Sequence, residues 1–191
     1  MTEQITYPSV TRILEATKPL EDRIALEQWR ERVGIEEADR ISKSALERGR
    51  KYDSFVEAFY IRKEEIPHKS LAKHLSNYEL HSLEQNVVSV EYGYKGRYDC
   101  IFKRNDTLIL NDFKGSSKYK KREWLKDYPL QISAYINAVR ESGIDIGYGM
   151  ISVILDNKIQ QFCFNHIEIE KHFNRFLERL NQYNEQLTTN Q

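Results

Sequence analysis

The chain has 191 residues, of which 40% are hydrophobic and 30% are charged, and its formal net charge at pH 7 is +0. These proportions are typical of a folded globular protein that can bury a core without disulfides. The balanced charge excludes a protein that coats nucleic acid by bulk positive charge, and no run of about 18 apolar residues is present to span a bilayer.

The N-terminal residues 1–85 are predicted to be mainly helical. A short helix follows Pro8, with Ser9 as its N-cap. A second helix is expected over about residues 22–33, ending at Gly34, which is a typical C-cap residue. These helices are expected to form a cap over the rest of the protein.

A third and longer helix is predicted over about residues 36–60. Its apolar stripe consists of Ile41, Ala45, Leu46, Tyr52, Phe55, Val56 and Phe59. Gly49 inside this helix costs about 1 kcal/mol relative to alanine, so a close packing contact is expected there. Residues 70–83 are predicted to form one more helix.

The pattern changes after residue 85. Three segments rich in β-branched and aromatic residues, 86–92, 97–103 and 107–113, predict a three-stranded antiparallel meander. An amphipathic helix over 124–140, strands over 148–155 and 160–164, and a last helix over 167–186 are expected to follow. We therefore expect a single α/β domain over residues 1–191. Its parts are the helical cap and first core helix (1–85), the sheet with its helix (86–166) and the C-terminal helix (167–191).

Two carboxylates and one amine are predicted to converge at the edge of this sheet. Because strand side chains alternate, Asp112 and Lys114 point to one face. Asp99 is expected on the neighbouring strand, within reach of the same face. Charges at the end of a core strand are costly unless they are paired or metal-bound. Carboxylates that hold a hard cation beside a lysine suit phosphodiester hydrolysis.

A bare D-x-K pattern is weak evidence, and the chain contains a second one, Asp156-Asn157-Lys158, in a predicted hairpin turn. The first pattern stands in a longer series. Gly96 and Asp99 precede Asp112-x-Lys114, and Gln131-x-x-x-Tyr135 follows on the next helix. This order and spacing are specific.

The segment KGRYDCIFKRNDTLILNDFKGSSK, followed by YPLQISAYINAV, resembles the RecB-like branch of the PD-(D/E)xK nucleases. It is particularly similar to the mitochondrial genome maintenance exonuclease group and its phage and bacterial relatives. YPSVTRILEAT, LEQWRERVG and ALERGRKYDSFVEAFY are similar to N-terminal segments of that group, in the same order. The resemblance implies a restriction-endonuclease-like three-layer core with a mixed sheet, bound Mg²⁺ or Mn²⁺, and digestion of single-stranded DNA from its ends.

The resemblance also implies residue roles. Asp99, Asp112, Lys114 and Gln131 match catalytic or site-supporting positions, and the metal would be held by Asp99, Asp112, the backbone carbonyl of Phe113 and Asp53. Asp53 is a departure, because the family usually has a histidine four residues after the helix glycine. Glu57 matches an acidic position that supports the site, although a surface acid explains it equally well.

A basic segment begins at Lys114 and reads KGSSKYKKREWLK, with six basic residues against the single acid Glu123. A solvated loop is the alternative interpretation. The residues predicted to contact DNA are Lys118, Lys120, Lys121, Arg122, Tyr135, Ser9, Thr11 and Arg12. Tyr119 or Trp124 could stack on bases, although core packing is favoured for Trp124 and capping explains Ser9 equally well.

Two other activities remain open: an endonuclease or duplex-end-resecting enzyme on the same fold, and a DNA-binding module whose nuclease site has degenerated, suggested only by Asp53. Four cysteines would be needed for an iron–sulfur relative, and the chain has only Cys100 and Cys163, which we expect to be small core residues in a reducing compartment. The five histidines are interpreted as scattered surface or site-supporting groups. A monomer in a bacterial or viral cytoplasm is expected, because no targeting segment is evident.

Overall fold

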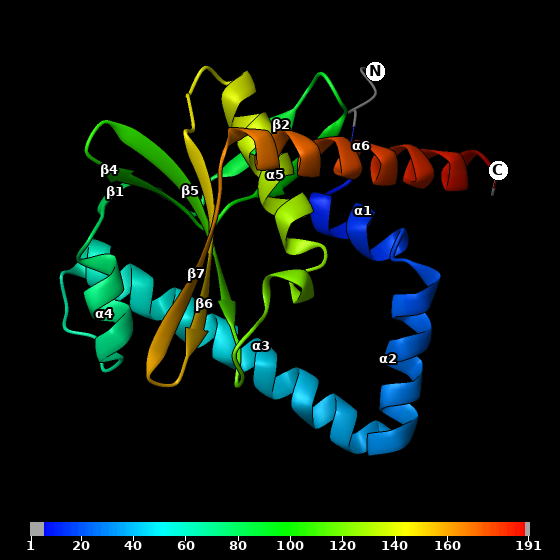
Figure 1. The fold of residues 1–191 in the computed structure, drawn as a ribbon, viewed down its shortest axis with the longest axis horizontal. Helices are drawn as coiled ribbons and strands as arrows, with labels where there is room; N and C mark the ends of the chain where they lie inside the picture. The colour runs from blue at the N-terminus through cyan, green and yellow to red at the C-terminus, as the bar shows by residue number, and fades with distance from the viewer. Residues whose placement is uncertain (1–5, 190–191) are drawn as a thin grey trace.

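The computed structural model describes residues 6–189. Its centre is a five-stranded sheet in the order β1-β4-β5-β6-β7 (Figure 1). The strands are β1 (Glu79–Leu83), β4 (Cys100–Arg104), β5 (Thr107–Gly115), β6 (Tyr148–Leu155) and β7 (Lys158–Phe164). β5 and β6 run parallel, whereas the other neighbouring pairs are antiparallel. The predicted mixed sheet is therefore confirmed.

Helices enclose this sheet. They are α1 (Val10–Ala16), α2 (Leu20–Val33), α3 (Ile35–Glu57) with a π-helical extension (Ala58–Arg62), α4 (Lys69–Leu75), a 3-10 turn (Arg122–Trp124), α5 (Tyr128–Glu141) and α6 (His166–Thr189). A separate two-stranded ribbon pairs β2 (Asn86–Ser89) with β3 (Tyr94–Arg97). No helix in the described part of the chain is both long enough and apolar enough to cross a membrane.

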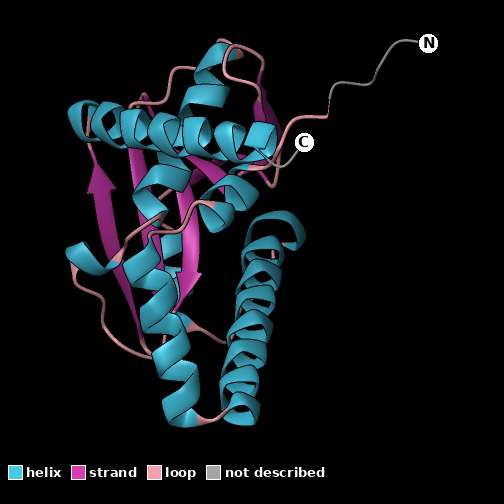
Figure 2. Cartoon of the chain, turned by 90° about the vertical axis from the view of Figure 1, so that its right-hand side faces the viewer, coloured by secondary structure: helices cyan, strands magenta, loops and turns pink. Residues whose placement is uncertain are grey.

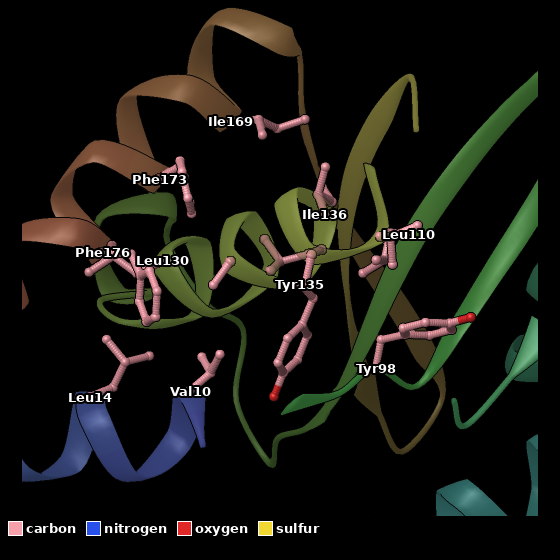
Figure 3. Packing of buried hydrophobic residues seen from close by; sticks show 14 of the residues in the cluster. Val10, Leu14, Tyr98, Leu110, Leu130, Tyr135, Ile136, Ile169, Phe173 and Phe176 are labelled. Carbon is pink, nitrogen blue, oxygen red and sulfur yellow. The ribbon is translucent and has the colours of Figure 1, made fainter. Parts of the chain in front are cut away.

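The sheet is the middle of three layers, and a hydrophobic core joins each of its faces to a layer of helices. In the first core, α1, α5 and α6 pack on one face of the sheet, and Figure 3 shows Phe173 and Phe176 of α6 directed toward α5. In the second core, α4 and the C-terminal half of α3 pack on the opposite face against Phe102 and Phe113. Alternation along each strand supplies both cores, since neighbouring residues of β4 and β5 belong to opposite faces.

α2 and the first half of α3 form an arm. Both views show these two helices as a V-shaped hairpin that extends away from the sheet (Figure 1, Figure 2). Every residue of α2 is exposed or half-buried. The predicted apolar stripe of α3 is correct only near its C-terminal end, because Leu46 is 57% exposed whereas Tyr52 and Val56 are buried. A Cβ at Gly49 would meet no described atom within 4 Å, so the predicted packing contact is wrong.

The prediction for residues 70–83 was wrong in its second half. α4 ends at Leu75, and Glu79–Leu83 forms the edge strand β1 against β4. Local propensity was overridden by tertiary packing, since Tyr78 stacks on Phe102 with ring centroids 4.8 Å apart and directs the next residues onto the sheet. The predicted meander was also wrong, because β1, not segment 86–92, is the third antiparallel strand.

Two further expectations need correction. The helix predicted to begin at Trp124 begins at Tyr128, after the 3-10 turn, with Pro129 in its first turn. Cys100 is buried as expected, but Cys163 is exposed because it lies on the edge strand β7.

Candidate active site

Asp112 and Lys114 lie on the same face of β5, as strand alternation predicted. Lys114 Nζ is 2.6 Å from Asp112 Oδ2. Asp112 is only 3% exposed, at the end of the first core. Lys114 also lies over the ring of Tyr128, with Nζ 4.9 Å from the centroid. Tyr128 was missed by the sequence reasoning, although it stands one turn before Gln131 on the helix that packs over this face.

Asp99 reaches the same place from a bend, not from a strand as predicted. It precedes β4 by one residue, and its Oδ2 accepts a 2.7 Å hydrogen bond from the backbone N–H of Phe113. The pairing of Cys100 with Asn111 in the next register position places Asp99 beside Asp112. The three predicted residues are thus brought together by β5 and by the bend that leads into β4.

The charges in this cluster are unbalanced. Burial, followed by repulsion from Asp112, raises the pKa of Asp99 to about 7. Burial acts to lower the pKa of Lys114, but attraction to Asp112 and Asp99 outweighs it and the pKa is raised. Two carboxylates therefore share one ammonium group. Asp112 is buried, and its Oδ2 has the 2.6 Å ion pair with Lys114 as its contact.

This donor set fits a hard divalent cation. Carboxylate and carbonyl oxygens are the ligands that Mg²⁺ and Mn²⁺ prefer, and an added positive charge would relieve the repulsion between Asp99 and Asp112. The two carboxylates do not form a complete site by themselves. In the part of the chain that the structure describes, no group of three or more histidine, cysteine, aspartate or glutamate side chains is arranged to hold a metal ion.

Asp53 and Glu57, the two acids of α3, differ in their surroundings. Asp53 is exposed overall, yet partial desolvation and then the charge of Glu84 raise the pKa of its carboxyl. Lys114 and Asp112 also act on that carboxyl, so Asp53 lies within electrostatic range of the cluster. Glu57 is instead paired with Arg62 at 3.1 Å. The site-supporting role expected for Glu57 stays a prediction.

Gln131 and Tyr135 form the wall beside the cluster. Gln131 Nε2 donates a 2.9 Å hydrogen bond to the hydroxyl of Tyr135, and Figure 3 shows the Tyr135 ring projecting from α5. Burial raises the pKa of Tyr135 to about 12. The packing of the Tyr135 ring explains why the motif has a glycine at position 96, because a Cβ there would lie 2.3 Å from this ring.

A polar hollow continues from this wall. It is lined by Ser9, Thr11, Asn86, Lys95, Gly96, Arg97, Gln131 and Tyr135. Ser9 is the N-cap of α1, with its hydroxyl accepting a bond from the backbone N–H of Arg12, while the Arg12 side chain is exposed. Asn86, Lys95 and Arg97 were not singled out by the sequence, because they belong to the β2–β3 ribbon, whose position depends on long-range packing.

The basic segment forms a loop with a fixed backbone. Gln160 of β7 accepts a hydrogen bond from the N–H of Lys120 (2.8 Å) and donates one to its carbonyl (3.1 Å). Lys118 and Lys121 are exposed, and Lys120 is half-buried. Arg122 is engaged elsewhere, donating to the carboxylate of Glu168 at 2.6 Å and to the carbonyl of Cys163.

The aromatic residues of this loop are more accessible than expected. Trp124 is 51% exposed, so the favoured interpretation as a core residue was wrong. Lys121 Nζ lies 5.3 Å from the centroid of the Trp124 ring. Tyr119 is 55% exposed, with Lys158 Nζ 5.8 Å from its ring centroid. The loop therefore presents cations and aromatic faces together.

Comparison with known proteins identifies similar sequences and a similar fold. A family model described as the PD-(D/E)XK nuclease superfamily matches residues 12–190. Mitochondrial genome maintenance exonuclease 1 of Xenopus tropicalis is 30% identical over 93% of this chain, and its mouse counterpart is 27% identical over 94%. The chain spans 57% and 60% of these relatives. The crystal structure of an alkaline exonuclease from Laribacter hongkongensis matches 98% of this chain and 94% of its own, with a TM-score of 0.50 and 13% identity.

Proposed function

Because the chain belongs to the PD-(D/E)XK nuclease superfamily, we propose that it is a divalent-metal-dependent exonuclease that hydrolyses single-stranded DNA from free ends. The observation that carries this proposal is the cluster of Asp99, Asp112 and Lys114, in which two buried carboxylates share one lysine. Such a cluster is costly for folding alone. A role in catalysis would explain why the protein retains this unfavourable cluster.

Each residue of the cluster has a proposed role. Asp99, Asp112 and the backbone carbonyl of Phe113 would hold Mg²⁺ or Mn²⁺, with Asp53 as a further ligand or the holder of a bound water. The ion would supply an activated water and neutralise phosphate charge. Lys114 would stabilise the charge that develops on the phosphoryl oxygens. Asp99 additionally fixes the Phe113 peptide through its hydrogen bond.

The DNA is proposed to run between the polar hollow and the basic loop, which begins directly after Lys114 in the chain. In the hollow, Ser9, Thr11 and Gln131 present hydroxyl and amide groups, and Lys95 adds a cation. In the loop, Lys118, Lys120 and Lys121 would contact phosphates. The exposed rings of Tyr119 and Trp124 suit the faces of unstacked bases, which supports the preference for single strands.

Attack from ends rests on the relatives named as exonucleases. The test is incubation with linear and covalently closed circular single-stranded DNA of one sequence, with Mg²⁺ or EDTA. We expect only the linear form to be degraded, and only with the metal. Cleavage of the circle would indicate an endonuclease. A monomer remains a prediction, which sedimentation can test.

The site assignment is tested by Lys114→Ala and Asp112→Ala, each of which should lower the cleavage rate by at least about a hundredfold. The second D-x-K pattern offers a matched control. Asp156 lies at the β6–β7 turn, and Asp156→Ala should leave the rate close to wild type; Lys158 is kept because it lies over the ring of Tyr119. A near wild-type rate in Lys114→Ala would show the assignment to be wrong, and a wild type that binds DNA without cleaving it would indicate a degenerate binding module.

A further inference from the structure

A line of polar side chains crosses the second core, on the face of the sheet opposite Asp112. Four neighbouring strands each contribute one residue, and α4 contributes the fifth: Cys100 (β4), Asn111 (β5), Ser152 (β6), Gln161 (β7) and His74 (α4). We call these five residues the polar row. Cys100, Asn111, Ser152 and His74 are buried. His74 had been expected near the surface or at the site.

The hydrogen bonds of the row have a defined direction. Gln161 Nε2 donates to His74 Nδ1 at 3.0 Å, so His74 Nε2 carries the proton that faces Ser152 Oγ at 3.2 Å. Ser152 Oγ donates to Asn111 Oδ1 at 2.6 Å. Asn111 Nδ2 in turn faces the Cys100 sulfur at 3.7 Å. Each inner member is therefore held from both sides.

The row ends beside the two carboxylates. Cys100 and Asn111 are a cross-strand pair, and each immediately adjoins one member of the cluster: Asp99 precedes Cys100, and Asp112 follows Asn111. Because successive strand side chains point to opposite faces, fixing Asn111 below the sheet fixes Asp112 above it. Ser152 connects β6 to the same place, because it follows Ile151, the residue of β6 that pairs with Asp112.

The neighbours of the row are apolar. Phe102, Phe113, Met150 and Ile154 surround it in the second core. A buried polar group in such surroundings costs free energy unless it is bonded, and an apolar layer would serve folding equally well. A fully bonded row instead restricts how far β4, β5 and β6 can shift against one another.

We propose that the polar row positions Asp99 and Asp112 for metal binding, with Ser152 and His74 as positioning residues that act through Asn111. This inference rests on the proposed function. Residues that orient ligands from a second layer typically change metal affinity by 10- to 100-fold when they are replaced. The row lies one residue further from the metal, so the lower end of that range is expected. Burial lowers the pKa of His74 to about 4, which keeps the ring neutral and its single proton on Nε2 at neutral pH.

The experiment is calorimetric titration of the metal-free protein with Mn²⁺, which requires no cleavage. Ser152→Ala removes the link between His74 and Asn111 and should raise the Kd for Mn²⁺ by about tenfold. Gln161→Ala removes the outermost link of the row, to His74, together with the bond from Gln161 to the Tyr78 hydroxyl, and should raise the Kd by less. Ser133→Ala and Ile154→Val are the controls: Ser133 is a buried serine in the other core, and Ile154 lies beside the row without joining it. Both should bind Mn²⁺ as the wild type does.

Cleavage assays give a second readout. At saturating single-stranded DNA, Ser152→Ala should require about tenfold more Mg²⁺ for half-maximal rate, while the KM for DNA stays unchanged. A purely structural row would lower thermal stability in Ser152→Ala without moving the Kd, as Ile154→Val should. A folded Ser152→Ala with a wild-type Kd overturns the inference alone, and if Ser152→Ala does not fold, Gln161→Ala decides in the same way. A wild type that binds no Mn²⁺ overturns the inference together with the proposed function.

Discussion

Replacing Asp99 by asparagine should stabilise the metal-free protein while abolishing metal-dependent cleavage. The carboxylate of Asp99 is held beside Asp112 with one lysine between them, and burial and this repulsion raise its pKa from an ordinary 3.8 to about 7. An amide removes the charge. It also keeps an oxygen that can accept the hydrogen bond from the N–H of Phe113.

The size of the effect follows from linkage. An acid whose pKa is raised by folding has no penalty below its unfolded pKa, and the penalty grows as the pH rises through 3.8 to about 7. Each unit of pKa shift corresponds to about 1.4 kcal/mol, so above pH 7 the penalty for the ionised Asp99 is at most about 4 kcal/mol. Asp99→Asn should therefore raise the free energy of unfolding at pH 8, by up to that amount, and change it little at pH 4.

The assay is urea unfolding in EDTA at pH 4 and pH 8. Asp106→Asn, at an exposed acid of the β4–β5 turn, is the control and should be neutral at both values. Adding Mn²⁺ at pH 8 should stabilise the wild type and leave Asp99→Asn unchanged. If Asp99→Asn is less stable than the wild type at pH 8, or if their difference does not depend on pH, the repulsion argued for this site is wrong.

Two other predictions concern the protein away from its carboxylates. Because burial lowers the pKa of His74 to about 4, this residue should contribute a loss of about 3 kcal/mol of stability as the pH falls from 6.5 to 4, opposite in sign to the contribution of Asp99. The difference between the wild type and His74→Gln in urea unfolding should isolate this loss, and parallel pH curves for the two proteins would refute it. Replacing Lys118, Lys120 and Lys121 by alanine should make the slope of log affinity against log salt shallower by about 0.7 for each lost contact to single-stranded DNA, up to about two units, with little change in thermal stability. Fluorescence anisotropy with a labelled oligonucleotide measures it, and an unchanged slope would identify a merely solvated loop.

Local rules predicted the parts of the site that lie within one element. Alternation alone placed Asp112 and Lys114 on one face of β5. Gln131 and Tyr135 were predicted on one helix four residues apart, and the structure shows that they are bonded to each other. Asp99 was assigned correctly to the cluster but wrongly to a strand. Its bend lies between the end of the separate β2–β3 ribbon and the start of β4.

The errors occur where a residue's partner is distant in sequence. Segment 79–83 is a strand because it pairs with the edge of β4, and this pairing cannot be predicted from the local sequence of the segment. Trp124 was expected inside because its helix was expected to begin there, whereas Pro129 and the 3-10 turn delay the helix by four residues. His74 was treated as scattered because its partners, Ser152 and Gln161, lie about eighty residues away.

Asn111 and Asp112 are neighbouring polar residues of β5 with different roles, one in packing and one at the candidate site. Both side chains are buried, both are polar, and they point to opposite faces of the sheet. Asn111 is bonded through Ser152 and Cys100, so its polarity serves the packing of the strands. Asp112 instead forms an ion pair with Lys114 at 2.6 Å and lies opposite a second buried acid, Asp99. Two buried carboxylates that share one lysine cost free energy which strand packing does not offset. This excess of negative charge identifies the face of β5 at which a cation is expected to bind.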